Sequence, residues 1–135
     1  MGLSIDQIKG VSSTHAKTLR KHGMGSSDSY LAATKTAAMR RELAQKLGVD
    51  EKMVLEHANR CDLARVKGIG VQFSNLLENA GVDTTKELSK RVPENLFFKL
   101  AEVNVGKRFC KRNPTSKEVK SWVAQAKRLK PALEY

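Results

Sequence analysis

The chain has 135 residues, with 25 Lys and Arg against 14 Asp and Glu, and its formal net charge is +11. A hydrophobic content of 40% is ordinary for a folded domain and argues against a disordered basic tail, and no apolar run is long enough to span a membrane. A pI near 9.9 makes polyanions, above all nucleic acid, the expected partners.

Short helices are predicted along the whole chain. Apolar residues recur at intervals of three or four in 43–47, 96–103 and 119–126, and no segment alternates convincingly at a period of two. Ser, Thr or Asp marks the helix starts and Gly the helix ends. The predicted N-caps are Ser4, Asp50, Asp62, Thr84 and Thr115, and the predicted C-terminal glycines are Gly23, Gly48 and Gly81. The expected fold class is all-α.

The two halves of the chain resemble each other in sequence. Ile8-Lys9-Gly10-Val11-Ser12 recurs 58 residues later as Val66-Lys67-Gly68-Ile69-Gly70. The final helices align at an offset of 65, which matches His57 to Trp122. Offsets that drift in this way are expected of duplicated units with a loop insertion. We therefore predict two pseudo-repeats packed as one compact domain, with the first unit in residues 1–60 and the second in 61–135.

The segment 63–81 carries the most informative pattern. It predicts a short helix ending at Lys67, a glycine turn and a second helix starting near Val71. Both glycines of the turn can take a positive φ, and Ile69 between them is expected to fill the gap between the helices. The amides at the start of the second helix then face an anion, which the helix dipole favours. The candidate binding residues here are Lys67, Gly68, Ile69, Gly70, Val71 and Gln72.

This segment resembles the helix-hairpin-helix motif, in which a hydrophobe-Gly-hydrophobe-Gly turn holds a nucleic-acid phosphate without reading sequence. The matching turn of the first unit contains the candidate residues Lys9, Gly10 and Ser12. Because Ser takes a positive φ less readily than Gly, this first turn is expected to be the weaker phosphate site. Nearly the whole chain resembles a family of duplicated helix-hairpin-helix domains of unassigned function, most clearly in 62–70 and 76–84.

The positive charge is distributed unevenly. Residues 61–104 have no net charge, whereas residues 105–135 contain nine basic and two acidic residues. The densest cluster, named here the basic cluster, comprises Lys107, Arg108, Lys111 and Arg112. Such a run can be a solvated face, but adjacent cations repel one another unless an anion lies close. A smaller patch is predicted at Lys17, Arg20, Lys21, Arg40 and Arg41.

Chemistry other than binding finds little support in the sequence. Cys61 and Cys110 are widely separated and predicted to be reduced and partly buried. With His15, His22 and His57 they form no metal-like spacing, and no nucleophile–base set or apolar carboxylate pair is evident. No catalytic residue, metal or cofactor is predicted, and we expect the protein not to be an enzyme.

These patterns favour non-sequence-specific binding of nucleic acid through its backbone phosphates, with duplex DNA favoured over RNA. The alternative is a helical interaction or adaptor module without nucleic-acid binding, whose hairpins pack on a protein partner or on a second copy and whose charge serves an acidic partner or solubility. The first ten residues lack the features of a signal peptide, so an intracellular location is expected, either cytoplasmic or in the nucleus or nucleoid. No membrane partner is expected, and the oligomeric state is left open.

Overall fold

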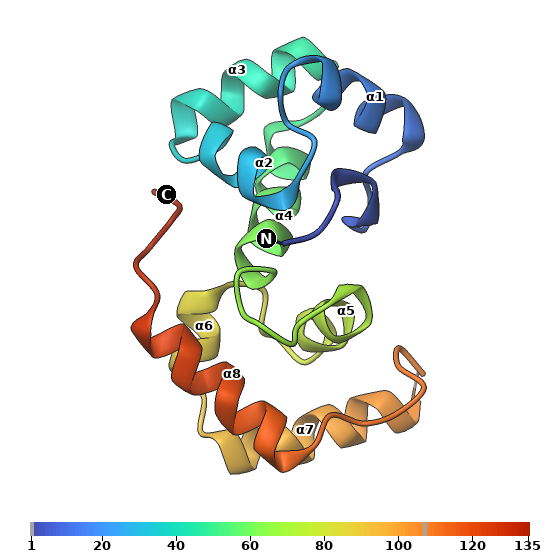
Figure 1. Cartoon of the computed structure of the whole chain (residues 1–135), viewed down its shortest axis with the longest axis vertical. Coiled ribbons are helices and arrows are strands. Elements are labelled where there is room, and N and C mark those ends of the chain that lie inside the picture. The colour runs from blue at the N-terminus through green and yellow to red at the C-terminus, as the bar shows by residue number, and fades with distance from the viewer. Residues whose placement is uncertain (1, 107) are drawn as a thin grey trace. The chain divides into compact units, whose positions relative to one another are not determined.

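The computed structural model describes residues 2–106 and 108–135. Every regular element in these residues is a helix, which confirms the all-α fold (Figure 1). The elements, in chain order, are η1 (Ile5–Gln7), α1 (Ser13–Lys21), α2 (Ser27–Ala33), α3 (Ala37–Leu47), α4 (Glu51–Leu63), α5 (Val71–Asn79), α6 (Thr85–Ser89), α7 (Pro93–Gly106) and α8 (Ser116–Arg128). An isolated β-bridge joins Ser4 to Ser26.

The helices pack into two compact units. Unit 1 consists of Met1–Arg65 with Pro131–Tyr135, and α2 and α3 both pack against α4 within it. Its core includes the fully buried Tyr30 and Val54. The C-terminal segment belongs to this unit because the Glu134 amide donates to the Lys35 carbonyl (2.8 Å).

Unit 2 consists of Val66–Lys130. Helices α6 and α7 pack against α8, and α5 packs against α7. Leucines from α5, α6 and α7 and the Trp122 ring of α8 are fully buried and form its centre. The helix α8 therefore serves as the element on which the rest of unit 2 assembles.

Most of the predicted helix boundaries are confirmed. Ser4 with Gln7 and Thr115 with Glu118 form reciprocal capping boxes, and the Thr84 hydroxyl accepts from the Glu87 amide. Asp50 occupies the N-cap position of α4. Gly48 lies at the C-cap of α3 with φ +67°, and Gly23 and Gly81 follow α1 and α5 with positive φ.

Two predicted boundaries are wrong. Asp62 does not begin a helix but lies in the last turn of α4, where its carboxylate accepts from Arg65 at 2.8 Å. The helix before the glycine turn therefore ends at Leu63 instead of Lys67. Residues 64–68 form turns because the Arg65 amide bonds back by three residues to Asp62.

Candidate nucleic-acid interface

The turn before α5 contains one glycine in the left-handed region. Gly68 has φ +97°, which an L side chain would strain, whereas Gly70 has an extended backbone with φ −97°. Of the two glycines that can take a positive φ, only Gly68 does so. Ile69 is buried, at 4% exposure.

The start of α5 presents backbone donors. Gly70 is the N-cap residue, and because glycine has no side chain it accepts no capping hydrogen bond from the helix. The first amide bonded within the helix is that of Ser74, to the Gly70 carbonyl at 2.9 Å, so the amides of residues 71–73 have no intrahelical acceptor. A Cβ added to Gly70 would meet no atom within 4 Å. The turn is therefore open at Gly70, and these donors follow it at the start of α5.

Helix α8 supports the opposite side of the same turn. The Gln125 side chain accepts from the Lys67 amide (2.9 Å) and donates to the Lys67 carbonyl (3.1 Å). A Cβ on Gly68 would lie 3.0 Å from Nε1 of Trp122, so the indole leaves little room for a side chain at this glycine. Gln125 and Trp122 therefore hold the turn from behind, and the Lys67 side chain is left exposed.

The turn before α1 has the same backbone but a different cap. Gly10 has φ +92°, and a Cβ there would lie 2.8 Å from Nε2 of His57. Arg60 donates to the Lys9 carbonyl at 2.7 Å. Ser12, at the position that matches Gly70, needs no positive φ because its φ is −71°. Its hydroxyl accepts from the His15 amide (3.1 Å), so one helix-start donor is already occupied.

The basic cluster is only partly available for a ligand. Lys107 lies outside the described residues. Arg108 and Lys111 are exposed, and neither forms an ion pair within the part of the chain that the structure describes. Arg112, by contrast, holds Glu118 in a two-point ion pair (2.7 and 3.0 Å). These bonds lower the pKa of Glu118 to about 2 and raise the pKa of Arg112.

Arg112 links the basic cluster to the glycine turn. Its guanidinium lies 5.2 Å from the centre of the Phe73 ring, and that ring lies 5.2 Å from the centre of the Trp122 ring. Phe73 belongs to the first turn of α5, so these contacts bring residue 112 to the start of that helix. Arg112 therefore connects the basic cluster to the start of α5, and its guanidinium is already paired with the Glu118 carboxylate.

Two polar side chains that sequence reasoning missed position these segments. One is Gln125, which holds the turn. The other is Asn104, buried at 4% exposure, which accepts from the Cys110 amide at 3.0 Å and donates to the Cys110 carbonyl and to Asn113. An isolated Asn or Gln in a helix gives no sequence signal, because its role depends on which loop packs against it. Cys110 is itself a buried free thiol, as is Cys61.

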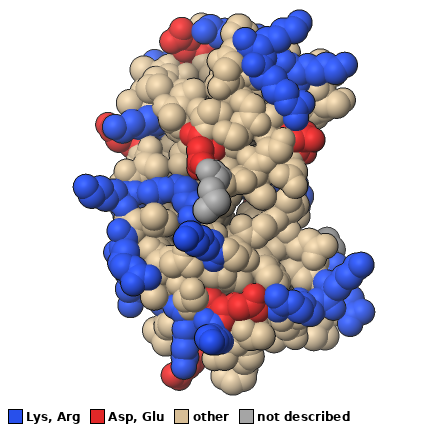
Figure 2. Space-filling model, in the orientation of Figure 1, with Lys and Arg blue, Asp and Glu red and all other residues tan. Residues whose placement is uncertain are grey.

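The smaller patch predicted in unit 1 is largely engaged within the protein. Arg40 is buried and donates to the carbonyls of Thr34 (2.9 Å) and Glu134 (2.7 Å). Arg20 pairs with Asp6 and Arg41 pairs with Glu51. Figure 2 shows Lys and Arg side chains projecting in several groups on the face in view.

One known protein family matches most of the chain. The family model of DUF4332, a domain of unknown function, matches residues 9–129. The chain belongs to this family. No curated protein and no solved structure matches it.

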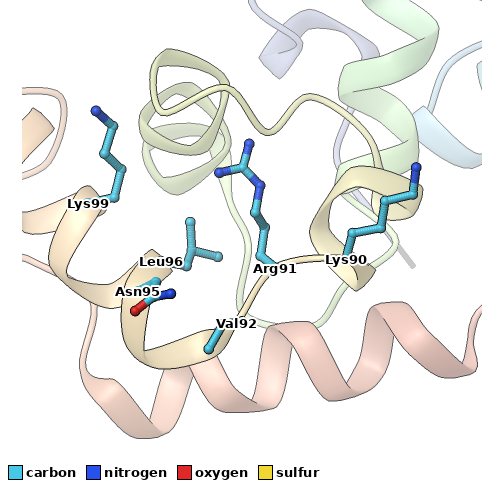
Figure 3. A pocket seen from close by; sticks show the side chains of 6 residues that line it. All are labelled: Lys90, Arg91, Val92, Asn95, Leu96 and Lys99. Carbon is cyan, nitrogen blue, oxygen red and sulfur yellow. The ribbon is translucent and has the colours of Figure 1, made fainter.

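The described part of this DUF4332 domain has a pocket, but no metal-binding cluster and no helix that could span a membrane. No group of three or more His, Cys, Asp or Glu residues there could hold a metal ion. Among the described helices, none is both long and apolar enough to cross a membrane. A pocket in unit 2, lined by Lys90, Arg91, Val92, Asn95, Leu96 and Lys99, was not predicted from the sequence (Figure 3).

Proposed function

We propose that this DUF4332 domain is a tandem helix-hairpin-helix protein that binds nucleic acid, with duplex DNA favoured, through backbone phosphates and without reading sequence. The observation that carries the proposal is the turn before α5, which is held by Gln125 of α8 and is followed by helix-start amides without a side-chain cap. A helix start of this kind attracts anions because its free N–H groups and the helix dipole act together.

The tandem character is supported by matching contacts at the two turns. Gly10 and Gly68 share a positive φ, and at each of them a Cβ would meet a ring from the last helix of its unit. The side chains of Arg60 and Gln125 both donate to the carbonyl of the lysine before the glycine. These pairs recur at the offsets of 58 and 65 residues found in the sequence.

The turn before α5 would carry the stronger phosphate contact. The amides of Val71 and Gln72 would donate to one phosphate, with the exposed Lys67 adding charge. Arg108 and Lys111 would contact neighbouring phosphates. The turn before α1 would contribute less, because the Ser12 hydroxyl already occupies an amide there. Contacts of this kind position a duplex without discriminating bases.

The proposal is tested by fluorescence anisotropy with a labelled duplex DNA, in a salt titration. Contact with about five phosphates gives a log–log salt slope of about −4 to −5 on B-DNA. Duplexes of unrelated sequence should bind with similar affinity, and duplex RNA and single strands serve as comparison probes. A flat salt response, or no binding at low salt, would refute the proposal.

A second candidate function is an adaptor that binds an acidic protein. The exposure of Phe98 (70%) and Val105 (81%) on α7 favours it, since large apolar side chains on one helix are common at protein interfaces. A polyacidic peptide that displaces the duplex as effectively as DNA of equal charge, together with weakened peptide binding by Phe98→Ala, would support this second function.

A further inference from the structure

A pocket of about 380 Å³ lies in unit 2 where α6 connects to α7. Lys90, Arg91 and Val92 come from the connection, and Asn95, Leu96 and Lys99 come from the first two turns of α7 (Figure 3). Leu96 is buried at 2% exposure, whereas Val92 is 55% exposed. A pocket of this volume is larger than an inorganic phosphate needs and falls at the small end of organic-ligand sites.

The pocket is surrounded by cations that have no carboxylate partners. In Figure 3 the side chains of Lys90, Arg91 and Lys99 extend to the same side, and Leu96 lies between those of Lys99 and Arg91. Within the described residues, none of the three cations forms an ion pair, and the lining contains no acid. Three like charges around one hollow repel one another, and an anion in the hollow would relieve this repulsion.

The arginine is held in position by the protein backbone. Nη2 of Arg91 donates to the Gly81 carbonyl at 3.2 Å, just beyond the end of α5. A guanidinium has five N–H donors, so this bond orients the group and leaves donors for a ligand. Lys90 and Lys99 are exposed and flexible enough to close on an anion from either side.

We infer that this pocket binds a terminal phosphate monoester carried on an organic group such as a nucleoside. A monoester near neutral pH carries close to two negative charges and three acceptor oxygens, which suits three cations better than the single charge of a backbone diester. The apolar side chains of Val92 and Leu96 would contact the organic substituent. A free nucleotide and the 5′ end of a nucleic-acid strand both present this chemistry.

The inference goes beyond the proposed duplex binding and does not rest on it. The pocket is linked to the C-terminal end of α5 through Arg91, whereas the glycine turn precedes the N-terminal end of that helix. A helix of nine residues separates the two ends by about 13 Å. Occupation of the pocket can therefore be followed separately from contacts at the turn.

The test is an NMR titration of the full ¹⁵N-labelled chain with adenosine 5′-monophosphate, and with adenosine as the matched control. The monophosphate should shift the amides of Lys90, Asn95 and Lys99 in a saturable way, and adenosine should not. The variant Lys90→Gln/Lys99→Gln should weaken this binding about ten-fold or more. Lys46→Gln/Lys52→Gln removes the same charge from unit 1 and should leave the binding unchanged.

A second arm compares a short single strand bearing a 5′-phosphate with the same strand bearing a 5′-hydroxyl. Tighter binding of the phosphorylated strand than of the monophosphate identifies the strand end as the source, and the reverse identifies a free nucleotide. The inference is overturned if neither phosphate monoester gives saturable shifts, if the dephosphorylated probes act equally, or if both double variants weaken binding alike. Duplex affinity should be the same in the two double variants, so failure of duplex binding leaves this result intact.

Discussion

The side chain of Gln125 forms two hydrogen bonds to the backbone of Lys67, accepting from its amide at 2.9 Å and donating to its carbonyl at 3.1 Å. The two residues are 58 positions apart, so a glutamine of the last helix fixes the conformation of the turn before α5. Orientation of the uncapped amides of that turn thus depends on a side chain that contributes no charge.

The first prediction concerns these two hydrogen bonds between Gln125 and Lys67. Gln125→Ala should lower the free energy of unfolding by about 1–3 kcal/mol, because both polar groups of Lys67 lose their partner. It should also weaken duplex binding, since the turn becomes mobile. Thermal unfolding, hydrogen exchange at the Lys67 amide and anisotropy measure these effects. Lys120→Ala, at an exposed position on the same helix, is the control for stability. An unchanged rate of hydrogen exchange at the Lys67 amide in Gln125→Ala would contradict the prediction.

The second prediction separates the two glycines of the turn. Gly68→Ala should destabilise the protein by about 1–3 kcal/mol, because its φ of +97° strains an L residue and its Cβ would lie 3.0 Å from Trp122. Gly70→Ala should destabilise the protein less, because that backbone is extended and its surroundings are open, so that only the poorer N-cap preference of Ala counts. Denaturant unfolding of both variants is the measurement, and equal destabilisation would show that the turn has another geometry.

The third prediction uses the N-cap position to test the anion site. Gly70→Asp should stabilise α5 by a few tenths of a kcal/mol, while its carboxylate accepts from the amides at the helix start. Duplex affinity should fall about ten-fold or more although the protein is more stable. Thr36→Asp adds the same charge at the N-cap of α3 and should leave affinity nearly unchanged. Loss of affinity in both variants would indicate a general charge effect.

The fourth prediction concerns the basic cluster. Arg108→Glu/Lys111→Glu should reduce duplex affinity strongly and make the salt slope shallower by about 2, because two phosphate contacts are lost. Arg112 is left intact because its bonds to Glu118 and its contact with Phe73 are structural. Lys46→Glu/Lys52→Glu in unit 1 makes the same change of charge. If both double variants bind equally, the basic cluster is not part of the interface.

The fifth prediction concerns acid stability. Burial, with a smaller contribution from Arg60, lowers the pKa of His57 from 6.5 to about 4. The unfolded chain therefore binds more protons between these values, and the free energy of unfolding should fall as pH decreases from about 6.5 to about 4. Denaturant midpoints measured across this range should show the fall in the native protein.

His57→Gln is the matched variant for this pH series. It cannot ionise, so its midpoint should depend less on pH within the same window. Glu118, whose pKa is lowered to about 2, loses its stabilising effect mainly at lower pH, as pH falls from about 4.5 towards 2. Identical pH dependence of the native protein and His57→Gln would show that the ring is not the responsible group.

Local features of this protein could be predicted from the sequence because they depend on a few adjacent residues. The spacing of apolar residues determines the helices, and Thr115 with Glu118 determines the start of α8 within one helical turn. The glycine at position 68 marks a turn because an L residue would be strained there. The start of α5 at Val71 follows directly from that turn.

Only the tertiary structure decides which charges remain available. Arg40 and Arg112 are both arginines in basic runs, yet the first is buried against carbonyls and the second is held by Glu118 and Phe73. The pocket around Arg91 lies in a segment with no net charge. Its lining is nevertheless cationic, because the packing places Lys90, Arg91 and Lys99 around it and leaves the acids of the segment outside the lining. The net charge of +11 is a property of the sequence, but its availability to a ligand depends on which helices meet.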